Sequence, residues 1–481
     1  MLLKRLFGVM VAVDLMAAGA AGIAPAAIAS AARVAPQPFM REIIQAADLH
    51  TPPTTAQCLA NPKIKIHCYQ PSQLSKAYGL DKLHAAGIDG RGRTIVIVDS
   101  FGSPTIAADL HAFDAAFGIP DPPSLVIRQD AGPVPLFDNT NADMLGWASE
   151  TTLDVEWAHV FAPGAKIVVE ETPVSETEGV QGFPEIVKAE NYVIDHGIGD
   201  VISQSFGATE ETFPSPQSIL DLRSAFKNAR KHHVTVLGSS GDTGAANYFA
   251  DGSCCYANAV NSWPSSDPLV TSIGGTQLHL DAAGVRLSPD SVWNDPNAVV
   301  RRHPNDPATC CAGGGGVSSV FKRPGFQEDV ASVTGAWRGT PDISLSAALD
   351  GAVLYYHTFA DSDAQTASGP WHLVGGTSES SPEFAGIVAM ADQVAGRRLG
   401  WINPAMYGLG SEDSGIVDVT TGNNTYKFFD ANNTLQTVQG YNAVEGYDLA
   451  SGLGTVNADQ FVRALADRQE RPGDGGDGGG G

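Results

Sequence analysis

The amino-acid sequence predicts an α/β fold with a mostly parallel central sheet and helices on both of its faces. Four short apolar runs rich in β-branched residues have the composition of parallel strands that are buried on both faces. These runs are 94–99, 165–169, 201–205 and 234–238. The stretches between them are long enough for the helices that connect parallel strands. The segments with helical character are 106–117, 183–196 and 218–231.

The chain has 481 residues, of which 43% are hydrophobic, so it can bury a large core. Because no internal repeat and no second-domain boundary is visible, we expect a single folded domain over residues 69–466. Residues 30–68 are expected to be a short N-terminal extension or pro-segment. The tail over 467–481 is rich in Gly and Asp and predicts disorder, since it cannot supply a core.

The charge balance excludes one class of partner. The 53 acidic and 29 basic residues give a formal net charge of −24. Binding to a phosphate backbone depends on clustered Lys and Arg, so we expect no nucleic-acid partner. The excess of acidic residues has two possible explanations. It either serves solubility alone, or it gives a surface whose carboxylates become protonated as pH falls and then no longer repel one another.

The first 29 residues have the pattern of a signal peptide. Lys4 and Arg5 precede an apolar stretch over 6–28, which ends in small residues at Ala27 and Ala29. A membrane anchor is the alternative, but the part rich in Gly and Ala makes a poor spanning helix. We therefore expect a secreted protein that does not remain attached to a membrane.

Six cysteines are compatible with an oxidising compartment. Cys58 and Cys68 are close in sequence, while the doublets 254–255 and 310–311 lie in loop-like segments. We expect a disulfide between Cys58 and Cys68 and at least one link between the doublets. A zinc cluster is the alternative, but the C-x-x-C spacing typical of such sites does not occur.

The segment 374–386 carries the strongest candidate for chemistry. Glycines at 375 and 376 precede Thr377 and Ser378, and a helix-like stretch follows over 384–394. A serine at such a helix start can be held at a tight turn, where backbone N–H groups can bind an oxyanion. The same residues would also serve as an ordinary helix cap, since Ser and Thr are favoured there.

The segment around Ser378 resembles the nucleophile motif G-T-S-x-x-x-P of the subtilisin and sedolisin clan. The histidine motif H-G-T-H-x-A-G of subtilisins is absent. In its place, the segment 149–167 is similar to the sedolisin motif E-x-x-x-D, with Glu150 and Asp154 at its acidic positions. Four further landmarks extend the resemblance from residue 69 to the end of the folded domain. They are the segments 201–207, 274–276, 313–318 and 341–344.

The resemblance implies a subtilisin-like fold and a secreted serine peptidase that cleaves polypeptides at acidic pH. We expect it to act as a monomer, with Ser378 as the nucleophile. Glu150 and Asp154 are one helical turn apart and share a face, so their carboxyl groups can be hydrogen-bonded to one another. Like charges at this spacing retain a proton between them, which makes the pair a base with an orienting partner.

Asp242 completes the expected catalytic set. It lies in the segment Gly-Ser-Ser-Gly-Asp-Thr-Gly over 238–244, which resembles the sedolisin motif A-A-G-D-S-G. In that family the aspartate takes the place of an oxyanion-hole asparagine. A carboxyl group donates a hydrogen bond only when protonated, so Glu150 must be ionised while Asp242 is neutral. Without the resemblance, Asp242 would be interpreted as a turn residue.

Two alternatives compete with this interpretation. The first is a neutral subtilisin-like peptidase in which His159 is the base and Asp99 its partner. If the helix continues that far, His159 lies on roughly the opposite face from Glu150. Asp99 itself ends the first core strand, where family members often have Glu. The second alternative is a secreted binding protein that has a peptidase fold and no catalysis.

A calcium site is expected near the C-terminus. The segments 417–424 and 444–454 resemble the sedolisin calcium loop, and the positions that match its ligands are Asp418, Val419, Val444, Gly446 and Asp448. Ca²⁺ takes about six to eight oxygen ligands, so two carboxylates supplemented by backbone carbonyls make chemical sense. Two Asx-type turns are the alternative explanation.

Overall fold

Eight strands form the central sheet, in the order β11-β10-β8-β6-β3-β5-β4, with β14 as a further partner of β10. All neighbouring strands in it run parallel except β10 and β11. Their bounds are β3 (Thr94–Ser100), β4 (Leu125–Arg128), β5 (Lys166–Thr172), β6 (Val201–Gln204), β8 (Thr235–Ser239), β10 (Thr271–Gln277), β11 (Ser291–Val292) and β14 (Ile343–Ser346). The predicted α/β fold with a mostly parallel sheet is confirmed.

The computed structural model describes residues 39–43, 49–295, 311–359, 369–410 and 414–468. All of them belong to one compact unit over residues 34–481. The signal peptide expected over 1–29 and the tail beyond 468 lie outside the described residues. Within the described ranges, no helix combines the length and the apolar character needed to cross a membrane.

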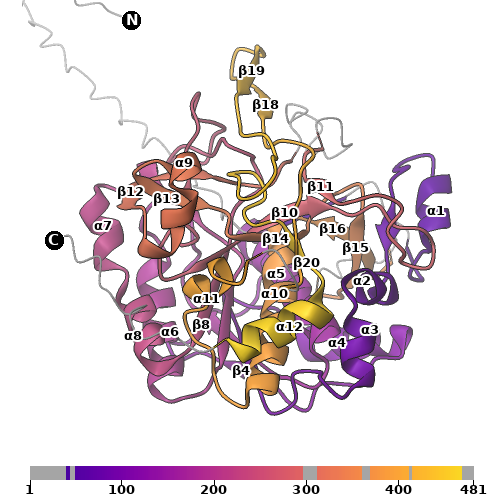
Figure 1. The fold of residues 1–481 in the computed structure, drawn as a ribbon. Helices are drawn as coiled ribbons and strands as arrows, with labels where there is room; N and C mark the ends of the chain where they lie inside the picture. Colours follow the sequence, from indigo (N-terminus) through magenta and orange to yellow (C-terminus); the bar gives the residue numbers. More distant parts are fainter. Residues whose placement is uncertain (1–38, 44–48, 296–310, 360–368, 411–413, 469–481) are drawn as a thin grey trace, which may run out of the picture. The chain divides into compact units, whose positions relative to one another are not determined.

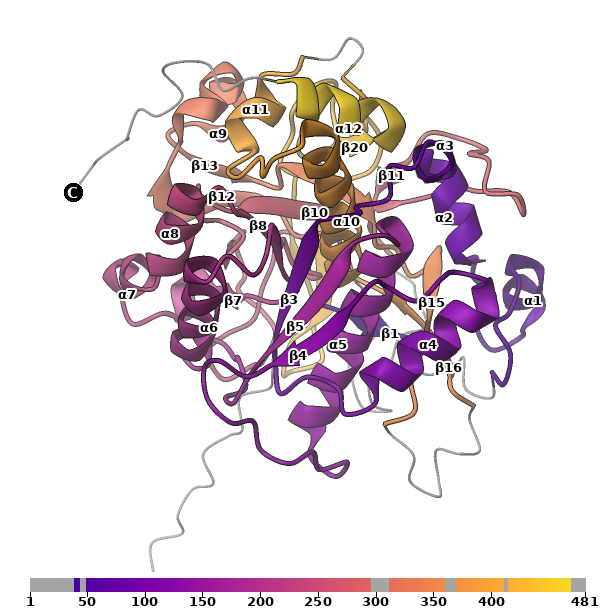
Figure 2. The ribbon, with the colours of Figure 1, turned by 90° about the horizontal axis from the view of Figure 1, so that it is seen from below.

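Helices cover both faces of the sheet, because alternate residues of a strand point to opposite sides. Ile95 and Ile97 of β3 belong to the apolar cluster on one face, and Val96 and Val98 to the cluster on the other. The first face carries α4 (Ile106–Phe117), α5 (Ala142–Phe161), α10 (Thr377–Ala395) and α12 (Ala458–Asp467), and the second carries α6 (Phe183–Asp195) and α8 (Ser224–His232). Figure 2 shows β3, β4 and β5 between these two groups of helices.

The helices α5 and α10 lie in contact with each other on the first face of the sheet (Figure 1). A Cβ atom built on Gly386 of α10 would lie 2.5 Å from the Cβ of Phe161 in α5. Real Cβ atoms do not approach so closely, so the glycine is what lets the two helices pack tightly here. This packing brings the start of α10 against the buried face of α5.

The expected helices agree with the structure except at one place. The predicted segment 106–117 matches α4, and 183–196 matches α6 to within one residue. The predicted segment 218–231 is instead divided into α7 (Pro216–Asp221) and α8. At the break, Arg223 forms an ion pair with the buried Asp267. A contact of this kind, between residues distant in sequence, is not visible in helical periodicity.

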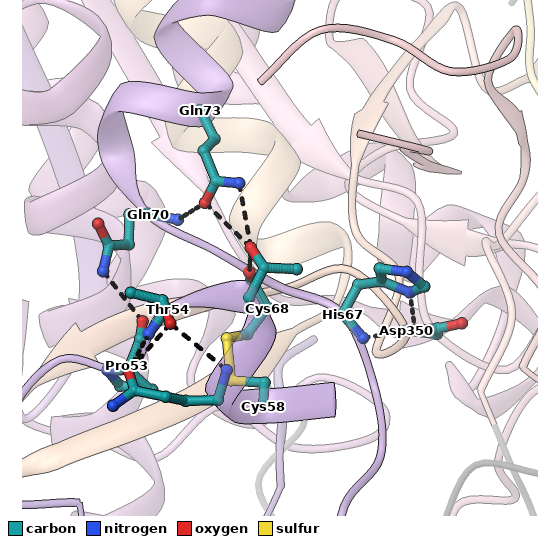
Figure 3. Close-up of a disulfide and its surroundings, with 10 residues drawn as sticks. Pro53, Thr54, Cys58, His67, Cys68, Gln70, Gln73 and Asp350 are labelled. Carbon is teal, nitrogen blue, oxygen red and sulfur yellow. Dashed lines mark hydrogen bonds and ion pairs between the residues drawn. A yellow bond between two sulfur atoms is a disulfide. The ribbon is translucent and has the colours of Figure 1, made fainter. Parts of the chain in front are cut away.

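A second, four-stranded sheet holds the N-terminal part of the chain. Its order is β1 (Arg41–Glu42), β16 (Trp371–Gly375), β15 (Ala352–Tyr356) and β2 (Cys68–Tyr69). The expected disulfide between Cys58 and Cys68 is confirmed, and it joins α1 (Thr55–Ala60) to β2. Figure 3 shows the disulfide and its surroundings. The Thr55 hydroxyl donates to the Cys68 carbonyl at 2.7 Å.

The expected link between the two cysteine doublets is wrong for the described residues. Cys254 is bonded to Cys255 instead. Cys311 is buried in the neighbourhood of Arg41, and Cys310 lies outside the described residues. Sequence spacing could not decide between these pairings, because the direction in which each side chain points is set by the folding of the surrounding loops.

Buried carboxyl groups predict that part of the fold's stability is greatest in acid. Burial raises the pKa of Glu190 in α6 to about 8, although its hydrogen bond from Gln204 acts in the opposite direction. The unfolded chain loses this proton near pH 4.5 and the folded chain near pH 8. The stabilisation is therefore complete below about pH 4.5 and is lost as pH rises through about 8.

We therefore predict that Glu190→Gln has the melting temperature of its parent at pH 4 and a melting temperature several degrees higher at pH 8. Circular dichroism during heating would measure both values, in a Ser378→Ala background that excludes self-digestion. Glu185→Gln, on the same helix but less buried, is the matched control. An equal effect of Glu190→Gln at the two pH values would contradict the prediction.

Candidate active site

Ser378 is the second residue of α10, directly after the turn that leaves β16. The turn consists of Gly376, whose φ of +125° is unfavourable for residues with a Cβ. A Cβ at this position would lie 2.3 Å from the Phe39 carbonyl oxygen and 2.8 Å from Asp242 Oδ2. The Ser378 side chain is fully buried, and its hydroxyl donates to the Ser205 carbonyl at 3.2 Å.

Glu150 and Asp154 lie on α5, and both are fully buried. Asp154 Oδ1 accepts a hydrogen bond of 2.9 Å from the Ser205 hydroxyl. The backbone carbonyl of Ser205 accepts a hydrogen bond from the Ser378 hydroxyl. Ser205 follows β6 directly, so the end of this strand connects the carboxyl pair of α5 to the first turn of α10.

Burial dominates the electrostatics of this group. It raises the pKa of Glu150 well above the usual range, and the neighbouring Asp99 raises it further, while Ser378 acts in the opposite direction. The pKa of Asp154 is also raised well above its usual range, first by burial and then by the charges of Asp99 and Glu150. Burial raises the pKa of Asp99 itself to about 7. The three carboxyl groups therefore cannot all be ionised at once, and they retain protons in acid.

Asp242 lies in the glycine-rich turn after β8 and is 1% exposed. Its Oδ1 accepts from the Thr377 backbone N–H at 2.8 Å and from the Thr377 hydroxyl at 3.0 Å. Its Oδ2 lies 3.6 Å from the Nε atom of Arg41. Thr377 thus ties Asp242 to the residue immediately before Ser378.

An extended N-terminal segment lies over these groups. The Phe39 backbone N–H donates to the Ser205 carbonyl at 3.0 Å. The Phe39 carbonyl accepts from the backbone N–H of Ser378 at 2.9 Å. Ser378, Glu150 and Asp242 are all buried in this structure.

Comparison with known proteins identifies relatives over most of the chain. Kumamolisin from Bacillus sp. (strain MN-32) is 30% identical over 404 residues, which are 82% of this chain and 63% of that protein. Xanthomonalisin from Xanthomonas sp. (strain T-22) is 26% identical over 412 residues, 82% of this chain and 46% of that protein. Sedolisin from Pseudomonas sp. (strain 101) is 29% identical over 288 residues, 58% of this chain and 43% of that protein.

The similarity to these three proteins supports membership of the sedolisin family. The chain spans about half the length of the curated relatives it matches, between 43% and 63% for the three named above. No family model matches the chain. Among solved structures, Pseudomonas sedolisin, a serine-carboxyl proteinase in complex with pseudo-iodotyrostatin, superposes with a TM-score of 0.65 at 24% identity. The superposition covers 82% of this chain and 97% of that chain, and it shows that the fold is shared.

The sedolisin-type residues expected from the sequence are brought together by the fold. Four of them lie around the start of α10, namely Ser378, Glu150, Asp154 and Asp242. His159, the alternative base, lies elsewhere on α5. Its Nε2 atom is 2.8 Å from the Pro120 carbonyl and 3.3 Å from Asp114 of α4. The structure thus places His159 against α4, on a different face of α5 from the one that carries Glu150 and Asp154.

Two buried glutamates next to the nucleophile were missed in the sequence. Glu379 and Glu383 follow Ser378 on α10 at a spacing of one helical turn, and both are fully buried. Burial raises the pKa of each well above its usual range, and Asp242 contributes to the effect on Glu379. The available signal was two acidic residues at i and i+4 in one helix, the same spacing as Glu150 and Asp154.

The loops expected to bind calcium also come together. The backbone N–H of Gly446 donates to Asp418 Oδ2 at 2.8 Å, and that of Val444 donates to Asp448 Oδ2 at 3.0 Å. The Ser451 hydroxyl lies 3.5 Å from the Val419 carbonyl. The five expected positions thus belong to one loop cluster that supplies only oxygen ligands, which fits a hard cation such as Ca²⁺.

A different cluster in the described part of the chain has the residue types of a metal site. Glu42, His357 and His372 each have one possible ligand atom, and these atoms lie within 4.8 Å of one another. Glu42 belongs to β1, and its carboxylate lies 2.8 Å from His372 Nδ1. In this structure the cluster holds the N-terminal segment in place through that contact.

Proposed function

We propose that this chain is a secreted serine-carboxyl peptidase that hydrolyses polypeptides at acidic pH through an acyl-enzyme on Ser378. The observation that carries the proposal is the location of Ser378 at the start of a helix, with the buried pair Glu150 and Asp154 on one side and Asp242 on the other. The relatives named above support the reaction class, since one of them is described as a serine-carboxyl proteinase.

In the first step, the Ser378 oxygen attacks the carbonyl carbon of the substrate's peptide bond. Glu150 takes the hydroxyl proton as general base and then gives it to the departing amine. Asp154 holds the Glu150 carboxyl in position, in the manner in which the aspartate of a Ser-His-Asp triad orients its histidine. Water then cleaves the ester, with Glu150 again taking a proton from the attacking oxygen and returning it to Ser378.

The negative charge on the tetrahedral intermediate needs donors that are already in place. The backbone N–H of Ser378 is one of them, because in this structure it donates to a carbonyl oxygen at 2.9 Å. The second is Asp242 in its protonated form, with Oδ2 directed toward the same space above Gly376. Hydrogen bonds from Thr377 to Oδ1 fix the other half of this carboxyl group.

The proposed reaction is confined to acid by two opposite requirements. Glu150 must lose its proton to act as a base, whereas Asp242 must keep its proton to donate. Burial and the nearby Asp99 raise the pKa of Glu150, so activity should rise only above the ordinary titration range of a glutamate. Activity should fall again once Asp242 ionises.

We further propose that Ca²⁺ binds in the C-terminal loop cluster through Asp418, Asp448 and the backbone carbonyls of Val419, Val444 and Gly446. The ion would neutralise the two carboxylates and hold the two loops together. Its role would be structural, because the residues that surround Ser378 already provide the base and the oxyanion donors.

The first prediction here concerns the base. Hydrolysis of denatured protein should have its maximum in acid, and Ser378→Ala should lower kcat by at least about 1,000-fold. Glu150→Gln should lower kcat by about 100-fold or more, because it cannot accept a proton. His159→Ala, at the alternative base, should keep the acid maximum. A maximum near neutrality that His159→Ala abolishes would contradict the proposal, and an absence of hydrolysis at every pH would favour a binding protein.

The second prediction concerns Asp99. Because the charge of Asp99 raises the pKa of Glu150, Asp99→Asn should shift the acidic limb of the pH–rate profile to lower pH. Glu156→Gln is the matched control, since Glu156 is a buried carboxyl on α5 whose Oε2 accepts from the Tyr356 backbone at 3.0 Å. An acidic limb that Asp99→Asn leaves in place would contradict the proposed coupling.

The third prediction concerns calcium. In a Ser378→Ala background, Ca²⁺ at 100 times its Kd should stabilise the fold by about 2.7 kcal/mol, and EDTA should remove this stabilisation. Asp418→Asn should abolish most of the difference between the melting temperatures in Ca²⁺ and in EDTA. Asp121→Asn, at an exposed aspartate in another loop, is the control. Equal melting temperatures in Ca²⁺ and EDTA would contradict calcium binding.

A further inference from the structure

One face of the N-terminal sheet gathers three side chains of the kinds that bind metal ions. Tyr355 of β15 is paired with His372 of β16, so these two side chains lie on the same face. His357 follows Tyr355 by two positions and therefore shares that face. Glu42 of β1 is paired with Val374, which is two positions from His372. The register of three strands thus brings Glu42, His357 and His372 together.

These three side chains lie close enough to share one metal ion. Their ligand atoms are within 4.8 Å of one another, and Glu42 Oε1 is 2.8 Å from His372 Nδ1. The rings of His357 and His372 are stacked, with their centroids 3.8 Å apart. In a tetrahedral zinc site with bonds of about 2.0 Å, the ligand atoms are about 3.3 Å apart. Small rotations of the three side chains are therefore enough to place an ion between them.

The ring of His357 is the observation that favours a metal site over a simple ion pair. This residue is 6% exposed, and neither its Nδ1 nor its Nε2 atom has a hydrogen-bond partner among the described residues. Burying a polar group without a partner is costly, and native proteins rarely do so without a reason. The ion pair of Glu42 with His372 leaves the nitrogens of His357 unsatisfied. A bound metal ion would accept a lone pair from one of them.

The ligand types determine which class of metal fits. Imidazole nitrogens suit Zn²⁺ and its neighbours among the transition metals, whereas Ca²⁺ and Mg²⁺ prefer oxygen ligands. Two histidines and one glutamate form a known zinc ligand set, in which water takes the fourth position. The side chains of His372 and Glu42 are 17% and 31% exposed, so an ion and a water molecule can reach the cluster from solvent. Its chemistry therefore differs from that of the loop cluster proposed to bind Ca²⁺.

A metal ion in this cluster would connect β1 to the rest of the sheet. Glu42 comes from β1, whereas the two histidines come from the paired strands β15 and β16 and the residue that follows β15. The strand β1 is only two residues long, and its pairing with β16 is extended by one hydrogen bond, from the Ile43 N–H to the Leu373 carbonyl. Three residues before Glu42, the Phe39 carbonyl accepts from the backbone N–H of Ser378. The ion would therefore fix the segment that lies over Ser378.

We propose that Glu42, His357 and His372 form a Zn²⁺ site that fastens the N-terminal segment to the sheet beside Ser378. Binding of the ion stabilises the arrangement in which this segment covers the serine, because one of the three ligands belongs to the segment itself. Metal binding requires no catalytic activity. Its tests therefore keep their meaning whether or not the proposed peptidase function is correct.

The direct test is a calorimetric titration of Zn²⁺ into the full chain carrying Ser378→Ala, at about pH 7.5, where an ordinary histidine is neutral. Excess Ca²⁺ in the buffer keeps the C-terminal loop cluster out of the measurement. We expect one Zn²⁺ ion per chain, and Glu42→Gln, His357→Ala and His372→Ala should each weaken binding at least about 10-fold. The matched control is His111→Ala, because His111 also lies 2.9 Å from a carboxylate, that of Asp121. This control should bind Zn²⁺ as its parent does.

Hydrogen exchange in the same protein tests whether the ion fastens β1. Zn²⁺ at 100 times its Kd should slow the exchange of the Ile43 N–H by up to about 100-fold, because β1 can then open only when the ion is released. Glu42→Gln should remove this protection. The amides of β18 (Tyr426–Phe429), which belong to a separate two-stranded sheet, are the internal control and should exchange at the same rate with and without Zn²⁺.

Three results would overturn the inference. The first is an absence of Zn²⁺ binding, and the second is binding that Glu42→Gln leaves unchanged. The third is tight binding that leaves the exchange of the Ile43 N–H unchanged, since the ion would then not fasten β1. If the buried substitution His357→Ala prevents folding, Glu42→Gln and His372→Ala decide the test, because both positions are partly exposed.

Discussion

The burial of carboxyl groups between α5 and α10 is the constraint on which the site depends. An isolated carboxylate in an apolar interior is costly, so a buried carboxyl group keeps its proton to a higher pH. Asp99, Glu150 and Asp154 are buried together, and the charge of Asp99 raises the pKa of both Glu150 and Asp154. The tight contact of the two helices at Gly386 keeps this group next to Ser378. Glu150 can accept a proton only when it is ionised, so burial and the charge of Asp99 set the lower limit of the pH range in which it could act as a base.

The parallel sheet explains why residues so far apart in the sequence meet at one place. Asp99 lies at the end of β3, Ser205 follows β6, and Asp242 follows the end of β8 by three residues. The carboxyl ends of parallel strands meet at the same edge of a sheet, which is where α/β proteins form their sites. The start of α10 lies against this edge, held there by hydrogen bonds from Ser239 and Thr377. The site is thus a property of the sheet's edge, completed by α5 and α10, which pack against each other on one face of the sheet.

The sequence was sufficient for the features that are encoded locally. The apolar runs predicted the strands of the parallel sheet, and the motifs around Glu150, Asp242 and Ser378 predicted which residues the fold would assemble. It was not sufficient where partners come from distant parts of the chain. The helix predicted over 218–231 is divided next to Arg223, which pairs with the distant Asp267, and Cys254 is bonded to Cys255 and not to the second doublet. The contact of Phe39 with Ser378 joins residues more than 300 positions apart, and no local pattern indicates it.

The N-terminal segment pairs with a strand edge that lies beside the site. An unpaired strand edge offers free N–H and C=O groups, which invite pairing with any extended chain. In β16 this edge leads into the turn before Ser378. As long as β1 is paired there, the edge is satisfied and Ser378 is buried. The strand pairing that would align an extended polypeptide at this edge is thus made by the chain's own β1.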